Sequence, residues 1–247
     1  MSSPSLSQLR ARIAALEGVG RAEGAGVWPL GGAAIDAVLP WGGIPLGCLH
    51  EIAPVVQSDG LEDGAALGFA ALWLGRLAEG LDKPVLWVAG DDDLYAPGLA
   101  ALGLTPAKLV VVRPAKAAQA LWAMEEGARC RGLAGVLGEV SGLAITAARR
   151  LQLAAQTSGV PILVINRGTP IASAVTRWKV GPAPSDGLAE EGVGPWRWRV
   201  ELARCRGRGF GEDAAWLVEW GDETHCLGVV APAGDRPAVS PRSRLAG

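Results

Sequence analysis

Four apolar residues near the start of the chain recur at intervals of three, four and three positions, and they are Leu6, Leu9, Ile13 and Leu16. This spacing predicts a helix of about three turns with one apolar stripe. A Gly-rich stretch follows it, so residues 1–26 are expected to form an N-terminal helix tethered by a linker. The stripe can pack back onto the chain's own core or dock onto a partner protein, and the pattern leaves both open.

The middle of the chain alternates between short apolar runs and longer helical patterns. Runs of the buried-strand type cover residues 48–52, 85–89, 109–113, 135–140 and 160–166. Helical patterns cover residues 65–79, 94–102, 115–130 and 145–157. Continuous apolar strands separated by helices predict an α/β fold, in which a mostly parallel sheet is flanked by helices on both faces.

After residue 166 the pattern changes to strands alone. Strand character covers residues 174–180, 196–205, 215–220 and 224–230, and residues 182–194 are expected to form a loop. We therefore expect one core domain over residues 27–230, with a β-rich C-terminal part. Pro, Arg, Ser and Gly dominate residues 231–247, which are predicted to be a disordered tail.

The bulk composition indicates a globular protein whose overall charge does not attract nucleic acid. Hydrophobic residues make up 49% of the chain and charged residues 19%, which is enough apolar material for a large core. The net charge of −2 attracts no nucleic acid in general, so direct DNA binding is expected to be weak or absent. We see no signal peptide and no apolar stretch long enough to cross a bilayer, so a cytoplasmic location without membrane contact is expected. The four cysteines are widely spaced, which favours reduced thiols over a metal site.

A phosphate-binding loop would be expected between the strand at 48–52 and the helix at 65–79. Such a loop needs a lysine for the phosphates and a Ser or Thr for magnesium, in the order Gly-Lys-Ser/Thr. That tripeptide occurs nowhere in the chain, and residues 53–64 contain no lysine. The degenerate loop contains Pro54, Asp59, Gly60, Asp63 and Gly64. Its carboxylates would repel a triphosphate, so we predict no bound cofactor and no ATPase activity, with Asp63 capping the helix.

Two further carboxylates lie after buried strands. Glu139 ends the strand at 135–140, where folds of this kind hold magnesium, but without the lysine it is expected to be a remnant that bonds locally. Asp91 begins an Asp-Asp-Asp run after the strand at 85–89. That run is either a former general-base position or a solvated turn that caps the next helix, and we favour the turn.

Residues 39–52 resemble the segment that precedes the phosphate loop in RecA recombinases, with a Gly-Gly-Ile-Pro turn before the strand. With the same spacing, Asp91 falls where RecA has its catalytic glutamate, and Glu139 falls where it has a magnesium-site aspartate. Asn166 followed by Arg167 resembles the Asn-Gln pair of the RecA sensor, with the glutamine replaced. The resemblance implies a RecA-like core whose DNA-binding loop, after Arg167, is much shortened.

The C-terminal half resembles the ImuA family, RecA-like proteins of the bacterial DNA-damage response. The residues that carry this resemblance are 176–180, 182–185, 196–200 and 204–207. It implies a non-catalytic accessory factor of SOS-induced, error-prone translesion synthesis. The implied partners are RecA, the inactive Y-family polymerase relative ImuB, and, indirectly, an error-prone replicative-type polymerase. Two alternatives remain open, a residual ATP-binding protein and a cell-division inhibitor of the SulA type.

The candidate partner-binding residues form two groups. One is the N-terminal stripe, which by the RecA resemblance could dock on RecA as a false subunit that does not extend the filament. The other is a basic set along the strand at 196–205, with tryptophans alternating on the opposite face. Its members are Arg197, Arg199, Arg204 and Arg206. This set is either the solvated face of a half-buried strand or a contact for an acidic partner or DNA.

Overall fold

The computed structural model describes residues 26–55, 61–90, 94–185, 195–207, 214–221 and 226–232. The predicted helix carrying Leu6, Leu9, Ile13 and Leu16 lies outside the described residues, as do Asp59, Gly60, Asp91 and residues 233–247. Those predictions therefore remain predictions. No helix in the described part of the chain combines the length and the apolar character that crossing a membrane requires.

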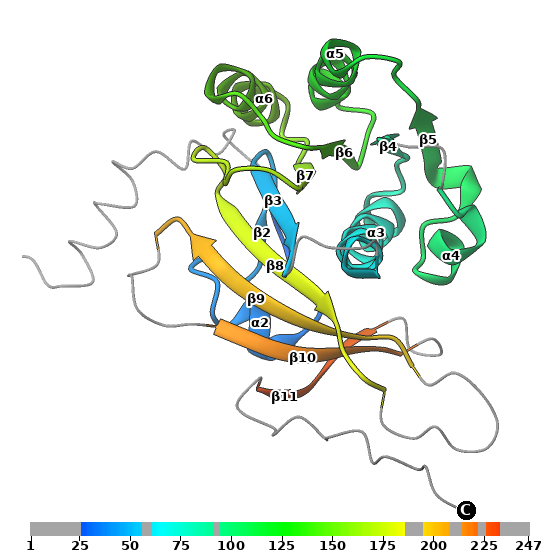
Figure 1. Cartoon of the computed structure of the whole chain (residues 1–247), viewed down its shortest axis with the longest axis vertical. Coiled ribbons are helices and arrows are strands. Elements are labelled where there is room, and N and C mark those ends of the chain that lie inside the picture. The colour runs from blue at the N-terminus through cyan, green and yellow to red at the C-terminus, as the bar shows by residue number, and fades with distance from the viewer. Residues whose placement is uncertain are drawn as a thin grey trace, which may run out of the picture.

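One sheet of nine strands runs through the described residues in the order β11-β10-β9-β8-β3-β7-β6-β4-β5 (Figure 1). The six strands from β8 to β5 are parallel to one another, whereas β9, β10 and β11 are added by antiparallel pairing. The strands are β3 (Leu49–Pro54), β4 (Val85–Val88), β5 (Leu109–Val112), β6 (Gly135–Val140), β7 (Ile162–Asn166), β8 (Thr176–Pro182), β9 (Arg197–Cys205), β10 (Ala214–Gly221) and β11 (Cys226–Pro232). This arrangement confirms the RecA-like α/β core with a β-rich C-terminal part.

Helices cover the two faces of the parallel strands separately. The long helix α3 (Leu61–Leu81) and the short α4 (Ala96–Ala101) lie on one face, and α5 (Ala117–Arg129) and α6 (Ile145–Ser158) lie on the other (Figure 1). A 3-10 turn, η1 (Pro106–Lys108), leads into β5. The faces divide by strand alternation, since Trp87 packs in the α3 cluster while Leu86 and Val88 pack with α5. Both sides of these strands are buried, which explains their continuous apolar sequence.

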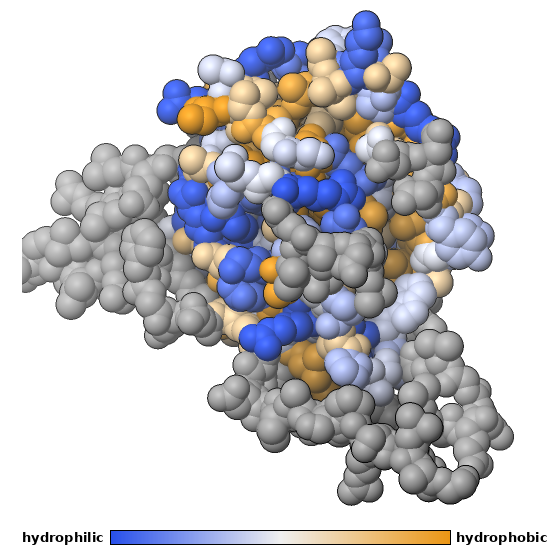
Figure 2. All heavy atoms as spheres, in the orientation of Figure 1, coloured by the Kyte–Doolittle hydropathy of each residue, from blue (hydrophilic) through white to orange (hydrophobic). Residues whose placement is uncertain are grey.

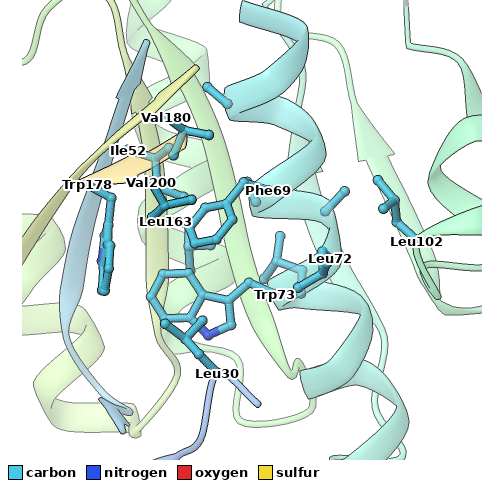
Figure 3. Close-up of a cluster of buried hydrophobic side chains, with 14 of the residues drawn as sticks. Leu30, Ile52, Phe69, Leu72, Trp73, Leu102, Leu163, Trp178, Val180 and Val200 are labelled. Atoms are coloured by element: carbon cyan, nitrogen blue, oxygen red, sulfur yellow. The ribbon is translucent and has the colours of Figure 1, made fainter. Parts of the chain in front are cut away.

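Large aromatic side chains fill the core between α3 and the sheet (Figure 3). The ring centroids of Phe69 and Trp178 are 6.1 Å apart, and those of Trp178 and Trp216 are 6.5 Å apart. Trp73 and Trp178 are fully buried. Tilted rings at these distances combine a large buried area with a favourable electrostatic geometry. The aromatic cluster therefore joins α3 to the β-rich C-terminal strands.

A small N-terminal unit was not predicted. It consists of β1 (Val27–Trp28), α2 (Ala33–Asp36) and β2 (Ile44–Pro45), with β1 antiparallel to β2. The carboxylate of Asp36 accepts hydrogen bonds from the backbone N–H groups of Leu30 at 2.8 Å and Gly31 at 3.1 Å. At Gly43 a Cβ would lie 2.7 Å from the carbonyl oxygen of Trp28, so only glycine fits under β1. Elements of two to four residues are too short to give a periodic signal.

The strand β8 belongs to the parallel part of the sheet. The sequence after residue 166 predicts β structure without giving its direction, and β8 is parallel to β3 in the centre of the sheet. Only β9, β10 and β11 form the antiparallel extension. The strand β11 also runs to Pro232, two residues past the predicted end of the core domain.

Candidate functional site

A cleft of about 880 Å³ opens at the carboxyl ends of β4, β6, β7 and β8, beside the first turns of α3. Side chains of α4 and the start of β9 complete its walls. In open α/β sheets this edge is where ligands bind, because the connections diverge there. The fold therefore places the first turns of α3, which follow the degenerate loop in the sequence, beside this cavity.

Arg167 links two carboxylates in this cleft. Its Nε lies 2.9 Å from Oδ2 of Asp63, in the first turn of α3, and its Nη2 lies 3.4 Å from Oε2 of Glu139 in β6. Glu139 also accepts a hydrogen bond from Nε1 of Trp87 at 3.0 Å. Glu139 therefore has one hydrogen-bond partner on β4 and another directly after β7.

The electrostatics of Arg167 follow from these neighbours. Partial burial on its own would lower the pKa of the guanidinium, but hydrogen bonds and charge attraction from Asp63, and then from Glu139, outweigh it and raise the pKa. In a working phosphate site the positive charge opposite such carboxylates comes from the metal ion that accompanies the nucleotide. Here the chain supplies that charge itself.

Asp63 does not have the predicted capping role. The helix begins at Leu61, so Asp63 is the third helical residue and its carboxylate pairs with Arg167. Gly64 lies inside the same helix, where an added Cβ would meet nothing within 4 Å. Pro54 is the last residue of β3 and is buried against the sheet.

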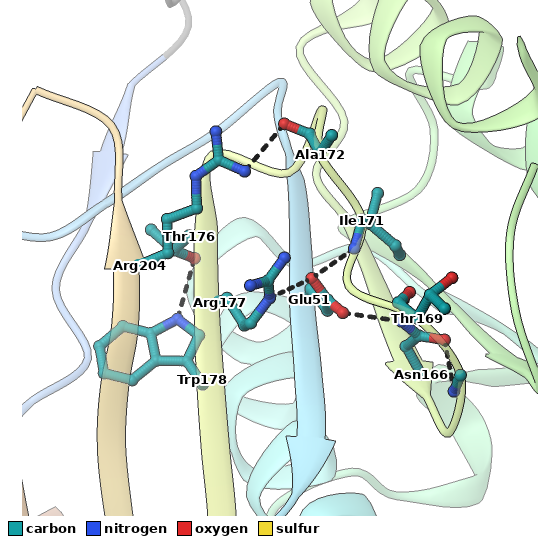
Figure 4. Close-up of polar contacts among 10 residues, drawn as sticks. Glu51, Asn166, Thr169, Ile171, Ala172, Thr176, Arg177, Trp178 and Arg204 are labelled. Atoms are coloured by element: carbon teal, nitrogen blue, oxygen red, sulfur yellow. Dashed lines mark hydrogen bonds and ion pairs between the residues drawn. The ribbon is translucent and has the colours of Figure 1, made fainter. Parts of the chain in front are cut away.

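Asn166 belongs to a buried polar network around Glu51 (Figure 4). Its Nδ2 donates to Oε1 of Glu51 at 2.7 Å and to the carbonyl of Thr169 at 2.9 Å. Oε2 of Glu51 accepts hydrogen bonds from Nε of Arg177 at 2.7 Å and from the backbone N–H of Ile171 at 3.0 Å. The network fixes the turn after β7, which begins with Arg167, so Asn166 has a structural role here.

Sequence reasoning missed Glu51 and Arg177. The available signal was a charged residue inside an otherwise apolar strand, since an ionised side chain is rarely buried unless it is paired. The sequence does not reveal that its partner lies 126 residues away.

The basic residues of β9 do not gather on one surface. Arg197 pairs with Glu219 at 2.5 Å and its side chain is only 9% exposed, whereas Arg199 is exposed. Arg204 and Arg206 donate to the carbonyl oxygens of Ala172 and Ser173, at 3.0 and 3.1 Å. At a strand rise of roughly 3.3 Å per residue, the five residues from Arg199 to Arg204 separate these two groups by roughly 17 Å.

Trp196 and Trp198 lie on the same side of the chain, as the alternation predicts, since both line the cleft and their ring centroids are 6.5 Å apart. Trp198 is buried, whereas Trp196 precedes the start of β9 and lies partly exposed at the rim of the cleft. The short connection from β7 to β8, residues 167–175, agrees with the predicted loss of a long DNA-binding loop.

Replacing Arg167 by alanine is expected to lower the free energy of unfolding by about 1–2 kcal/mol, because Glu139 then remains mostly buried without its cation. Urea unfolding of the two proteins measures the difference. Arg149→Ala is the matched control, since Arg149 is exposed and forms no ion pair with any residue that the structure describes. An equal loss in both variants would show that the pairing contributes nothing.

The sheet order and the cleft together define a protein with a RecA-like core and a degenerate phosphate loop. No family model matches the chain. The chain is 36% identical over 233 residues to Protein ImuA of Caulobacter vibrioides, in strains NA1000 / CB15N and ATCC 19089 / CIP 103742 / CB 15. The match covers 87% of this chain and 93% of each relative. The chain therefore belongs to the ImuA family.

Proposed function

We propose that the chain is a non-catalytic accessory factor of SOS-induced, error-prone translesion DNA synthesis, and that it acts in the cytoplasm by binding other proteins. Its membership of the ImuA family supports the mutagenesis role. The observation that carries the proposal is the pairing of Arg167 with Asp63 and Glu139 at the former phosphate site. A site whose two carboxylates are already paired with a guanidinium of the chain itself has no need of a nucleotide and its metal ion.

In this proposal the chain binds RecA and the polymerase relative ImuB, and it reaches the error-prone replicative-type polymerase indirectly. Direct DNA binding contributes little. The net charge is −2, and Arg197 and Arg204 are held by a carboxylate and a backbone carbonyl. RecA is the partner for which the chain's own fold offers a mechanism.

The RecA-like core can join a RecA filament as a subunit that ends it. A heterologous, head-to-tail contact extends a filament only if each new subunit offers the next interface. The apolar stripe at Leu6, Leu9, Ile13 and Leu16 supplies one contact. The edge strand β5 supplies a second contact. Among the described residues it pairs only with β4, and all four of its residues are apolar. Without ATP at the shared interface, the next subunit is not held.

Deleting residues 1–20 is expected to weaken RecA binding at least tenfold, because the stripe is then lost while the core remains. Biolayer interferometry with immobilised RecA measures the affinity of both forms. In the full chain, Leu9→Glu with Ile13→Glu should reproduce the loss, whereas Arg12→Ser, off the stripe, should not. If neither the full chain nor the truncated form binds RecA, the false-subunit mechanism fails and ImuB becomes the main contact.

A further inference from the structure

The cleft at the carboxyl ends of the strands has an aromatic rim. Tyr95, which precedes α4, is 71% exposed, and Trp196, which precedes β9, is 39% exposed. Both line the cleft, and the ring centroids of Trp196 and Trp198 are 6.5 Å apart. Leu99 and Leu102 add an apolar wall. Aromatic side chains exposed at the mouth of a cavity are typical of binding surfaces.

The charges inside the cleft favour a cation. Asp63 and Glu139 contribute two negative charges, and Arg167 contributes one positive charge between them. Arg197 also lines the cleft, but it pairs with Glu219. Oδ1 of Asp63 has no hydrogen-bond partner among the residues that the structure describes. When Glu219 is counted with Arg197, three carboxylates face two guanidinium groups among the described residues, so one negative charge remains and disfavours phosphate and carboxylate ligands.

From this combination we infer that the cleft binds an extended segment of a partner protein that carries an arginine or lysine beside apolar side chains. Aromatic faces attract a guanidinium or ammonium group and pack against its apolar stem. The carboxylate of Asp63 then pairs with the charged end. A volume of about 880 Å³ lies in the range of ligand pockets, roughly 300–1,000 Å³. The inference rests on the proposed function in one respect, that the chain acts by binding proteins.

Three labelled nonapeptides test the inference directly on the full chain. They share the sequence Gly-Ser-Leu-Leu-X-Leu-Leu-Ser-Gly, and X is arginine, its neutral analogue citrulline, or glutamate. Fluorescence anisotropy is expected to show at least tenfold tighter binding of the arginine peptide than of the citrulline peptide, and weaker binding still of the glutamate peptide. Equal affinities for all three, or no binding of any, would overturn the inference, as would displacement of the arginine peptide by ATP.

Variants of the full chain locate the binding. Tyr95→Ala and Trp196→Ala should each weaken the arginine peptide at least fivefold, and Asp63→Asn should reduce the preference over citrulline. Trp122→Ala is the matched control, since Trp122 is 66% exposed on α5, away from the cleft, and its loss should change nothing. A loss with Trp122→Ala equal to that with Trp196→Ala would refute the site. RecA binding, measured separately, shows whether the proposed function fails on its own.

Discussion

Replacing Glu51 by alanine is expected to lower the free energy of unfolding by about 3–5 kcal/mol, the cost of breaking a buried ion pair from one side. The side chain of Glu51 is 2% exposed and that of Arg177 is 17% exposed, so the arginine would remain largely buried without its carboxylate. The Nδ2 of Asn166 and the backbone N–H of Ile171 would each lose an acceptor as well. Domains of this size are stable by only about 5–15 kcal/mol in total, so the variant should be severely weakened.

Urea unfolding followed by tryptophan fluorescence measures this effect, because the buried tryptophans report on the core. Glu126→Ala is the control, since Glu126 pairs with Arg129 on the exposed surface of α5, and its loss should cost less than about 1 kcal/mol. A cost below 1 kcal/mol for Glu51→Ala would mean that the network forms without contributing to stability. The turn after β7 should also loosen in this variant, which would displace Arg167 from Asp63.

Stability should also fall by about 3 kcal/mol between pH 6.5 and pH 4 because of His50 alone. Burial lowers the pKa of His50 from 6.5 to about 4, and the hydrogen bond to the carbonyl of Pro45 only partly offsets that effect. Above pH 6.5 the imidazole is neutral in both the folded and the unfolded chain, so its contribution is constant. Between the two values the unfolded chain takes up a proton and the folded chain does not, so the folded state loses stability as the pH falls.

The hydrogen bonds of His50 fix which nitrogen of the neutral ring carries the proton. A carbonyl oxygen can only accept, so Nε2 carries the proton and donates to Pro45 at 2.9 Å. Nδ1 then accepts from the hydroxyl of Thr176 at 2.8 Å, and that hydroxyl accepts from Nε1 of Trp178 at 2.9 Å. A second proton on the ring would require the Thr176 hydroxyl to turn its own proton away from Nδ1.

Comparison with His50→Gln isolates the contribution of His50 to the pH dependence of stability, because every other titrating group is common to both proteins. The stability of the wild-type chain should drop more steeply between pH 6.5 and 4 than that of the variant, with the two profiles parallel above pH 7. Urea titrations at several pH values give both profiles. Parallel profiles over the whole range would show that His50 takes up its proton as readily in the folded chain as in the unfolded chain.

The sequence was informative where structure depends on local pattern. The strand at 135–140 has the predicted bounds, and α5 and α6 begin and end within two residues of expectation. Continuous apolar runs identify strands that are buried on both faces, and this physical reason also gives the parallel sheet. The absence of a Gly-Lys-Ser/Thr sequence can likewise be established from the sequence without a structure.

Contacts between residues that are far apart in the sequence could not be predicted from the pattern of apolar and polar positions. Arg167 and Asp63 are 104 residues apart, and only the fold brings the end of β7 next to the start of α3. The alternation in β9 suggested a continuous basic face, but Glu219 on β10 draws Arg197 into an ion pair. A charge seen in a sequence is available to a partner only if no neighbouring strand has already neutralised it.

The position of Arg167 has a consequence for timing. In a phosphate site with a working loop, a nucleotide and its metal ion supply the charge that faces the carboxylates. Hydrolysis and product release remove that charge, and the conformation can change with each round. A guanidinium that belongs to the chain itself never leaves. We therefore expect the associations of this protein to be governed by how much of it and of its partners is present, and to have no hydrolytic step that ends them.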